Sequence, residues 1–220
     1  MQQVMLDEIV GLERYEKIRD VFRRRIIELK KHRRVSVGDR ITFVFENHET
    51  VLFQIQEMLR AEHITDIDKI RLEVEVYNEL IPGDGELSTT MLIEITDQAQ
   101  IRPELVRLIG IDQAVSLQIG NQFAIPGVFE GGRSTEDNLS AVQYVRFPLL
   151  AEARSAFCAE RQEVQLIINH PHYQAQAVLS PDVQRSLAAE LQRAQVDSEK
   201  PAGKKVWNAK SVNGQPSSSP

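Results

Sequence analysis

The chain has 220 residues, of which 42% are hydrophobic and 26% charged, an ordinary composition for a globular protein. This length suits one well-buried domain with an appendage. The sequence contains one cysteine, Cys158, which excludes an intramolecular disulfide and a metal cluster held by thiolates alone. Apolar runs are short and the N-terminus lacks a secretory pattern, so we expect a cytoplasmic protein that does not enter a membrane.

The formal net charge of -6 is distributed unevenly. Residues 13–40 contain eleven Lys or Arg against five acidic residues. Apolar residues recur there every three or four positions, which predicts one amphipathic helix over 12–32 with solvated charged faces. Binding of nucleic acid through this basic helix is a lesser alternative, because the exposed aromatic residues that single strands require are not interleaved with the bases.

The first part of the chain, 1–83, is expected to be rich in helix. A short helical start near 6–10 precedes the long helix, after which the apolar period changes from 3.6 to 2 around Gly38-Asp39 and predicts a hairpin. Two further helices follow, and Pro82-Gly83 ends the second. The expected hairpin strands and helices are 34–37, 40–45, 47–62 and 66–81.

The second part, 84–194, is expected to be rich in sheet, with short helices at 102–109 and 150–158. We predict an irregular connection over 121–133. The expected strands are 87–95, 115–119, 141–147 and 163–168.

The tail over 195–220, which contains Trp207, is predicted to be disordered because it is rich in Lys, Ser, Asn, Gly and Pro. The predicted fold class is α+β, with N-terminal helices packed on a mainly antiparallel sheet in a single domain, 1–194.

The helix over 47–62 carries two stripes at helical spacing, one apolar and one that combines Phe53, Gln56, Glu57 and Arg60. The mixed stripe predicts specific partners for these side chains. A buried hydrogen-bonded network that fixes this helix against the next one is the favoured interpretation. The alternative is a ligand- or partner-binding surface, with eight candidate residues: Asn47, Gln54, Gln56, Glu57, Arg60, Tyr77, Asn78 and Glu79.

No nucleotide-binding loop, zinc-protease motif or nucleophile elbow occurs in the sequence, and none of its motifs indicates a cofactor. His170 and His172 are two residues apart on an expected extended segment, so both side chains would face one side and could bind a metal ion. The simpler interpretation is a pair of hydrogen-bonded histidines beside a strand bent by Pro171. The alternative to a binding protein is therefore a metal-dependent or acid/base enzyme that uses Glu57, Glu79, His170 and His172.

Several segments resemble an uncharacterised bacterial family known as a domain of unknown function: Phe45-Glu46-Asn47, then 50–62, 77–83, 85–88 and 142–147. The resemblance extends from about Leu6 to Leu187, and His48 departs from the arginine expected next to the Phe-Glu-Asn motif. Members of that family tend to be encoded beside rubrerythrin-like proteins and cysteine-rich iron-sulfur oxidoreductases. The resemblance thus implies a redox or peroxide-stress setting and a redox partner protein. Combined with the residue patterns, it favours a non-catalytic accessory or ligand- and partner-binding protein.

Overall fold

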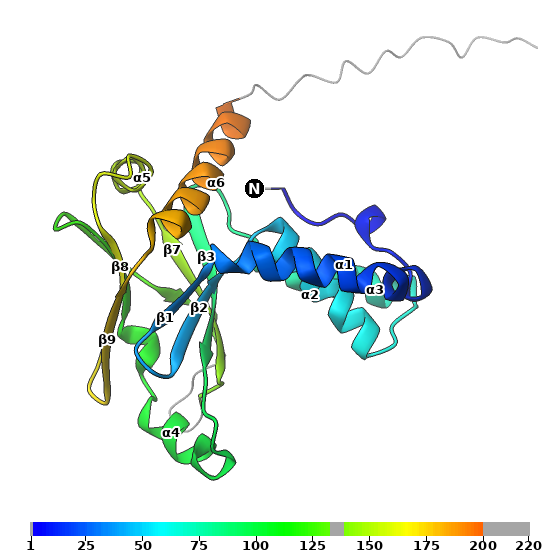
Figure 1. Cartoon of the computed structure of the whole chain (residues 1–220), viewed down its shortest axis with the longest axis horizontal. Helices are drawn as coiled ribbons and strands as arrows, with labels where there is room; N and C mark the ends of the chain where they lie inside the picture. The colour runs from blue at the N-terminus through cyan, green and yellow to red at the C-terminus, as the bar shows by residue number, and fades with distance from the viewer. Residues whose placement is uncertain (1, 133–138, 200–220) are drawn as a thin grey trace, which may run out of the picture.

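The computed structural model describes residues 2–132 and 139–199, and its centre is a sandwich of two antiparallel sheets (Figure 1). In the first sheet the order is β1-β2-β3-β7-β6, and in the second it is β5-β4-β8-β9. The strands of the first sheet are β1 (Arg34–Val37), β2 (Ile41–Phe45), β3 (Glu86–Ile93), β7 (Val142–Pro148) and β6 (Val128–Phe129). Those of the second are β5 (Phe123–Pro126), β4 (Val115–Ile119), β8 (Val164–His170) and β9 (Tyr173–Val178).

The main hydrophobic core lies between the two sheets, where one face of each strand is apolar. On β7, for example, Val145 and Phe147 are fully buried, whereas Tyr144 and Arg146 alternate with them and point to the outer face of the first sheet. The side chains of the outer face are therefore available to contact other elements.

Residues 123–129 form two strands where the sequence predicted an irregular connection, so that prediction was wrong. The chain pairs with β4 as β5, passes through Gly127 and pairs with β7 as β6. Gly127 makes this crossing possible because a Cβ atom there would lie 2.7 Å from Cγ1 of Val145.

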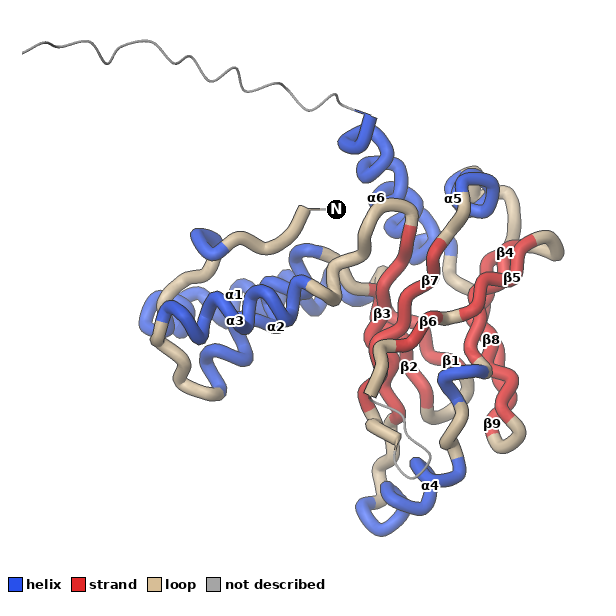
Figure 2. Tube along the Cα trace, turned by 180° about the vertical axis from the view of Figure 1, so that it is seen from behind, coloured by secondary structure: helices blue, strands red, loops and turns tan. Residues whose placement is uncertain are grey.

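Three helices pack together on the outer face of the first sheet and project to one side of the sandwich (Figures 1 and 2). They are α1 (Leu12–Lys31), α2 (His48–Ala61) and α3 (Ile67–Asn78). Asn47 caps α2 by accepting from the Thr50 amide, and Asp66 caps α3. A second, smaller core holds them together, with Val51, Ile55 and Leu59 buried at its centre. The α+β fold, with N-terminal helices packed on an antiparallel sheet, is thus confirmed.

The remaining helices are α4 (Ile101–Arg107), α5 (Ala151–Cys158) and α6 (Pro181–Glu199), with 3-10 turns at Leu6–Glu8, Gln98–Gln100 and Ile111–Gln113. The sequence patterns did not predict α6, which packs beside α5 (Figure 1). Its last turn enters the segment 195–220 that was expected to be disordered, and the rest of that segment, with Trp207, lies outside the described residues.

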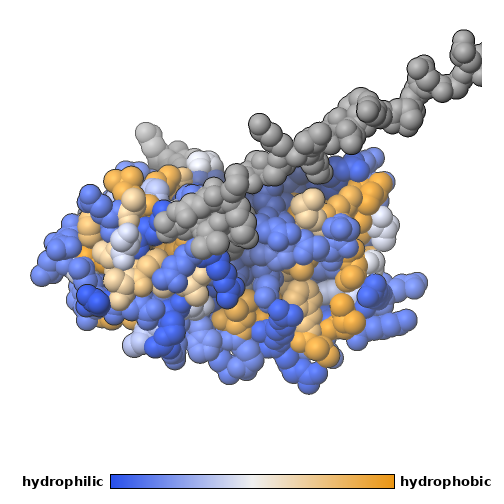
Figure 3. All heavy atoms as spheres, turned by 90° about the horizontal axis from the view of Figure 1, so that it is seen from above, coloured by the Kyte–Doolittle hydropathy of each residue, from blue (hydrophilic) through white to orange (hydrophobic). Residues whose placement is uncertain are grey.

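No helix in the described part of the chain combines the length and the apolar character that crossing a membrane would require. Polar side chains cover much of the face seen in Figure 3, and apolar groups gather on it toward both ends of the molecule.

Candidate functional site

The predicted polar stripe of α2 does not form one site, because its side chains turn toward different neighbours. Glu57 contacts α1, where Arg19 donates to it from Nε and Nη2 at 2.7 and 2.8 Å and the Tyr15 hydroxyl donates at 2.8 Å. Nε of Arg60 lies 3.5 Å from the same carboxylate, and its Nη1 lies 3.7 Å from Glu16. This network joins α1 to α2.

The contacts of Glu57 change the acidity of two groups. Hydrogen bonds from Arg19 are the main cause that lowers the pKa of Glu57 to about 2. Burial, together with the hydrogen bond to Glu57, raises the pKa of the Tyr15 hydroxyl. At neutral pH Glu57 is therefore an ionised, weakly basic carboxylate that serves the helix interface.

Two amide side chains of the predicted site hold the N-terminal segment instead of a ligand. Gln56 pairs with both backbone groups of Val10, and Asn78, the last residue of α3, pairs with both backbone groups of Val4. Tyr77 is half-buried against the smaller core. These residues therefore fasten residues 2–10 across the helices.

Asn47 and Gln54 belong to a buried polar network that also contains residues the sequence interpretation missed. Glu46 is 3% exposed, and its carboxylate accepts from Gln54 and from the hydroxyls of Thr50 and Thr90. Asn47 donates to Glu190 on α6 at 2.8 Å. Each oxygen of Glu46 thus has a donor, as a buried carboxylate requires.

Arg33, fully buried directly after α1, completes this network. Its guanidinium donates to the carbonyl of Phe45 and to both oxygens of Glu190, at 2.7 and 2.8 Å. No local pattern indicated its burial, because Arg33 lies beyond the helix predicted over 12–32 and among other basic residues.

The two histidines of the predicted metal site lie at the hairpin between β8 and β9, with ring centroids 5.8 Å apart. His170 is 4% exposed, its Nε2 lies 3.0 Å from the Ile109 carbonyl, and its Nδ1 accepts from the His172 amide at 3.2 Å. Both ring nitrogens of His170 are thus engaged with backbone groups. Within residues 2–132 and 139–199, no group of three or more His, Cys, Asp or Glu is arranged to hold a metal ion.

The four residues of the enzyme hypothesis do not converge. Glu57 lies between α1 and α2, the histidines lie at the β8–β9 hairpin, and Glu79 borders a cleft beside the first sheet. Catalysis or metal binding by these four residues stays a prediction, and their side chains do not meet at a common centre.

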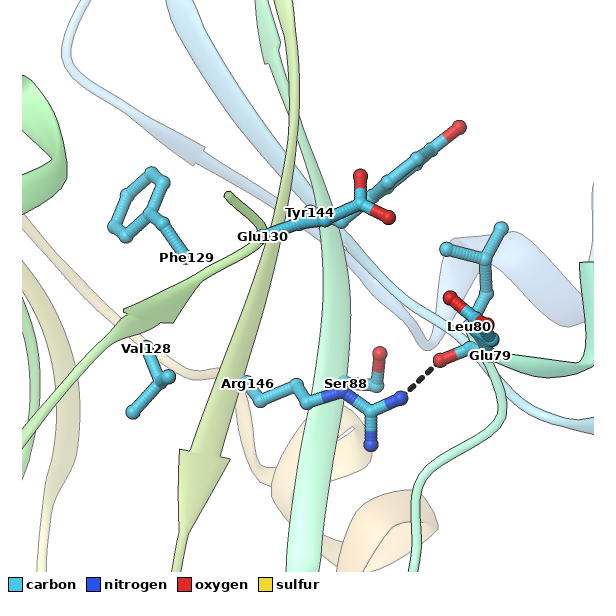
Figure 4. Close-up of a pocket in the computed structure, with 8 residues that line it drawn as sticks. All are labelled: Glu79, Leu80, Ser88, Val128, Phe129, Glu130, Tyr144 and Arg146. Atoms are coloured by element: carbon cyan, nitrogen blue, oxygen red, sulfur yellow. Dashed lines mark hydrogen bonds between the residues drawn. The ribbon is translucent and has the colours of Figure 1, made fainter. Parts of the chain in front are cut away.

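The cleft beside Glu79 has a volume of about 190 Å³ and combines residues from the end of α3, from β3 and from the β6–β7 pair (Figure 4). Arg146 on β7 donates to the carboxylate of Glu86 and to the backbone carbonyl of Glu79, which fixes its guanidinium under the end of α3. The lining residues are Glu79, Leu80, Ser88, Val128, Phe129, Glu130, Tyr144 and Arg146.

The exposed surface of the cleft is more apolar than polar, and its charged residues are Glu79, Glu130 and Arg146. Glu130 and Tyr144 lie together on one side of the Arg146 side chain, and Glu79 and Leu80 face them from the helix end (Figure 4). Phe129 pairs with the inward-facing Val145 and packs against the main core, so its ring points away from the polar groups. Glu86 forms an ion pair with Arg146, and Glu79 places a further carboxylate beside the guanidinium.

Three of the segments on which the family resemblance rests meet at this cleft: 77–83 supplies Glu79 and Leu80, 85–88 supplies Ser88, and 142–147 supplies Tyr144 and Arg146. Of the predicted site residues, Glu79 alone lines it. The sequence interpretation missed Arg146 and Tyr144, although their alternation with Val145 and Phe147 indicates an outward-facing pair.

Comparison with known proteins gives a family and a fold. The profile of the family described as "Protein of unknown function (DUF3501)" matches residues 3–191. A crystal structure of a novel protein of unknown function from Burkholderia pseudomallei K96243 is similar, with 34% identity and a TM-score of 0.81 over 86% of this chain and 100% of that one. No curated protein matches the chain in sequence. The match over nearly the whole described chain shows that this protein belongs to the DUF3501 family.

Proposed function

We propose that the protein is a non-catalytic binding protein that docks a partner protein, and that the cleft between α3 and the first sheet receives one positively charged side chain of that partner. The observation that carries this proposal is the lining of the cleft. Glu79 supplies negative charge, and Tyr144 supplies an aromatic ring, to which cations are attracted. The volume of about 190 Å³ is below the range of about 300–1,000 Å³ typical of small-molecule pockets, so it suits a single side chain.

Arg146 acts in this proposal as a fixed support. Its guanidinium ties β7 to the end of α3 through the Glu79 carbonyl, which holds the Glu79 side chain at the rim of the cleft. A binding group kept in place before its partner arrives loses less conformational entropy on association.

The partner class we propose is a redox protein, either rubrerythrin-like or an iron-sulfur oxidoreductase. This choice comes from the family resemblance in the sequence. Burial raises the pKa of the Cys158 thiol, which keeps this thiol a weak nucleophile at neutral pH. This property is compatible with a chain that leaves the redox chemistry to its partner. In this proposal the partner carries out the redox chemistry and this chain provides a docking surface.

The test is calorimetric titration of the full chain with purified candidate partners of both classes. Glu79→Lys should weaken binding about tenfold or more, because a like charge would meet the incoming cation. Glu75→Lys is the matched control, since Glu75 is an exposed residue one turn earlier on α3, outside the cleft. Equal losses in the two variants would place the binding surface elsewhere, and the absence of binding by either class would contradict the proposed partners.

A further inference from the structure

The N-terminal segment, residues 2–10, lies across the helices much as a bound peptide would. It runs outward over α1–α3, and the chain then returns along α1 (Figure 1). Of these nine residues one is buried, Val4, which is 1% exposed and inserts into the smaller core. The other residues of the segment are exposed or half-buried, and Leu6 and Ile9 among them pack against the smaller core.

Two side chains of the helices recognise the backbone of the segment, while His48 Nε2 contacts a side chain, the Glu8 carboxylate, at 3.0 Å. Asn78 accepts from the Val4 amide at 2.9 Å and donates to the Val4 carbonyl at 3.0 Å. Gln56 accepts from the Val10 amide at 2.8 Å and donates to the Val10 carbonyl at 3.2 Å. Such pairs do not depend on the side chain of the residue that is held, so they suit a peptide of any sequence at these two positions.

A pocket also lies beside the segment. This pocket of about 240 Å³ is lined by Leu6 and Ile9 of the segment together with Leu59, Ile64 and Ile70 of the α2–α3 pair. Because this lining is apolar, a peptide with a bulkier apolar residue at that position would bury additional surface that the chain's own segment does not cover.

We propose that the groove formed by α2 and α3 is a peptide-binding site that residues 2–10 occupy within the same chain. Its ligand from outside is a peptide with a small aliphatic residue at the position of Val4, a single turn after it as in Leu6–Glu8, and a large apolar residue beside the pocket. The chain's own segment competes with that ligand, so the apparent affinity of the closed protein is reduced by the fraction of molecules in which the groove is open. This site is separate from the cleft at Arg146, and the inference does not rest on the proposed function.

The first test uses a fluorescent peptide with the sequence of residues 2–11 and the full chain carrying Val4→Asp. A carboxylate in place of a buried valine should release the segment from the groove. We expect this variant to bind the peptide at least about tenfold more tightly than the wild-type chain does, and Gln3→Asp, at an exposed neighbouring position, to behave as wild type. Equal affinity in all three proteins, with the variants shown to be folded by circular dichroism, overturns the inference.

A second measurement on the wild-type chain does not depend on any variant. The amides of Val4 and Val10 are held by side chains, so hydrogen exchange reports directly on opening of the segment. If the segment detaches from an intact protein, these amides exchange at least about a hundredfold faster than the amide of Ile55 within α2. Exchange at the rate of Ile55 would show that the segment opens when the whole domain unfolds, and would overturn the inference.

Discussion

Two arginines that are neighbours in sequence illustrate how burial determines the role of a charge. Arg33 is fully buried and joins the end of α1 to Glu190 on α6, whereas the side chain of Arg34 is half-exposed and pairs with Glu94 on the surface. A buried charge that loses its partner retains the full cost of its desolvation. An ion pair on the surface contributes little to the free energy of unfolding.

Truncation of these two arginines should therefore have very different effects. Arg33→Ala leaves Glu190 without its guanidinium and the Phe45 carbonyl without a donor, so we expect a loss of about 3–5 kcal/mol in the free energy of unfolding. Arg34→Ala, the matched control, should cost at most about 1 kcal/mol. Urea unfolding followed by circular dichroism measures both, and equal losses would show that Arg33 does not anchor α6.

Glu57 gives a prediction about pH. Its pKa falls from 4.5 to about 2 on folding, so the ionised carboxylate stabilises the native state fully above about pH 5, and this contribution is lost as the pH falls toward 2. Glu57→Gln should thus reduce the free energy of unfolding by about 1–3 kcal/mol at neutral pH. Thermal melts of both proteins between pH 7 and 2 test this prediction, which fails if their difference is independent of pH.

The elements show what sequence patterns can predict and what they cannot. Long apolar periods predicted α1 and α2 within one or two residues of their observed ends, because a single buried face determines them. The strands β5 and β6 have only four and two residues, too few to show a periodic pattern. The first forms a hairpin with β4, whereas the second pairs with β7, which is not its neighbour in local sequence. A local pattern therefore indicated a loop where the sheets require strands.

The limits of local patterns also explain why the predicted site residues lie at different places in the structure. The period of α2 places Gln56, Glu57 and Arg60 near one another on its surface, but it does not reveal the neighbours that these side chains meet. The structure shows that α1 receives Glu57 and that the N-terminal segment receives Gln56. The stripe was predicted to fix α2 against α3, but Glu57 and Gln56 find their partners in α1 and in the N-terminal segment, which only the tertiary arrangement determines.

The close approach of Gly127, between β5 and β6, to the main core gives a prediction about stability. Gly127→Ala places a methyl group 2.7 Å from Cγ1 of Val145, inside the main core, and should cost about 1–3 kcal/mol. Gly131→Ala is the control, since nothing lies within 4 Å of a Cβ atom there. Thermal unfolding compares the two variants, and an unchanged melting temperature for Gly127→Ala would contradict the close approach.

At the scale of the whole molecule, the sandwich and the helices are joined by polar contacts as well as by apolar ones. Arg33 and Glu46 connect the end of α1, the first sheet and α6, while Arg146 ties the end of α3 to β7. The proposed binding cleft lies at this second junction, so its shape depends on the helices being held against the sheet.

The measurement that tests the central claim most directly is a nuclear magnetic resonance titration of the full chain with N-acetyl-argininamide, with the uncharged citrulline analogue as control. We expect the arginine derivative to shift the backbone amide resonances of Ser88 and Arg146, with a dissociation constant in the millimolar range, about -4 kcal/mol, and Glu79→Gln to weaken this response. The citrulline analogue should leave these resonances unchanged. Equal shifts with both compounds, or none at the cleft, would contradict the claim that it receives a positively charged side chain.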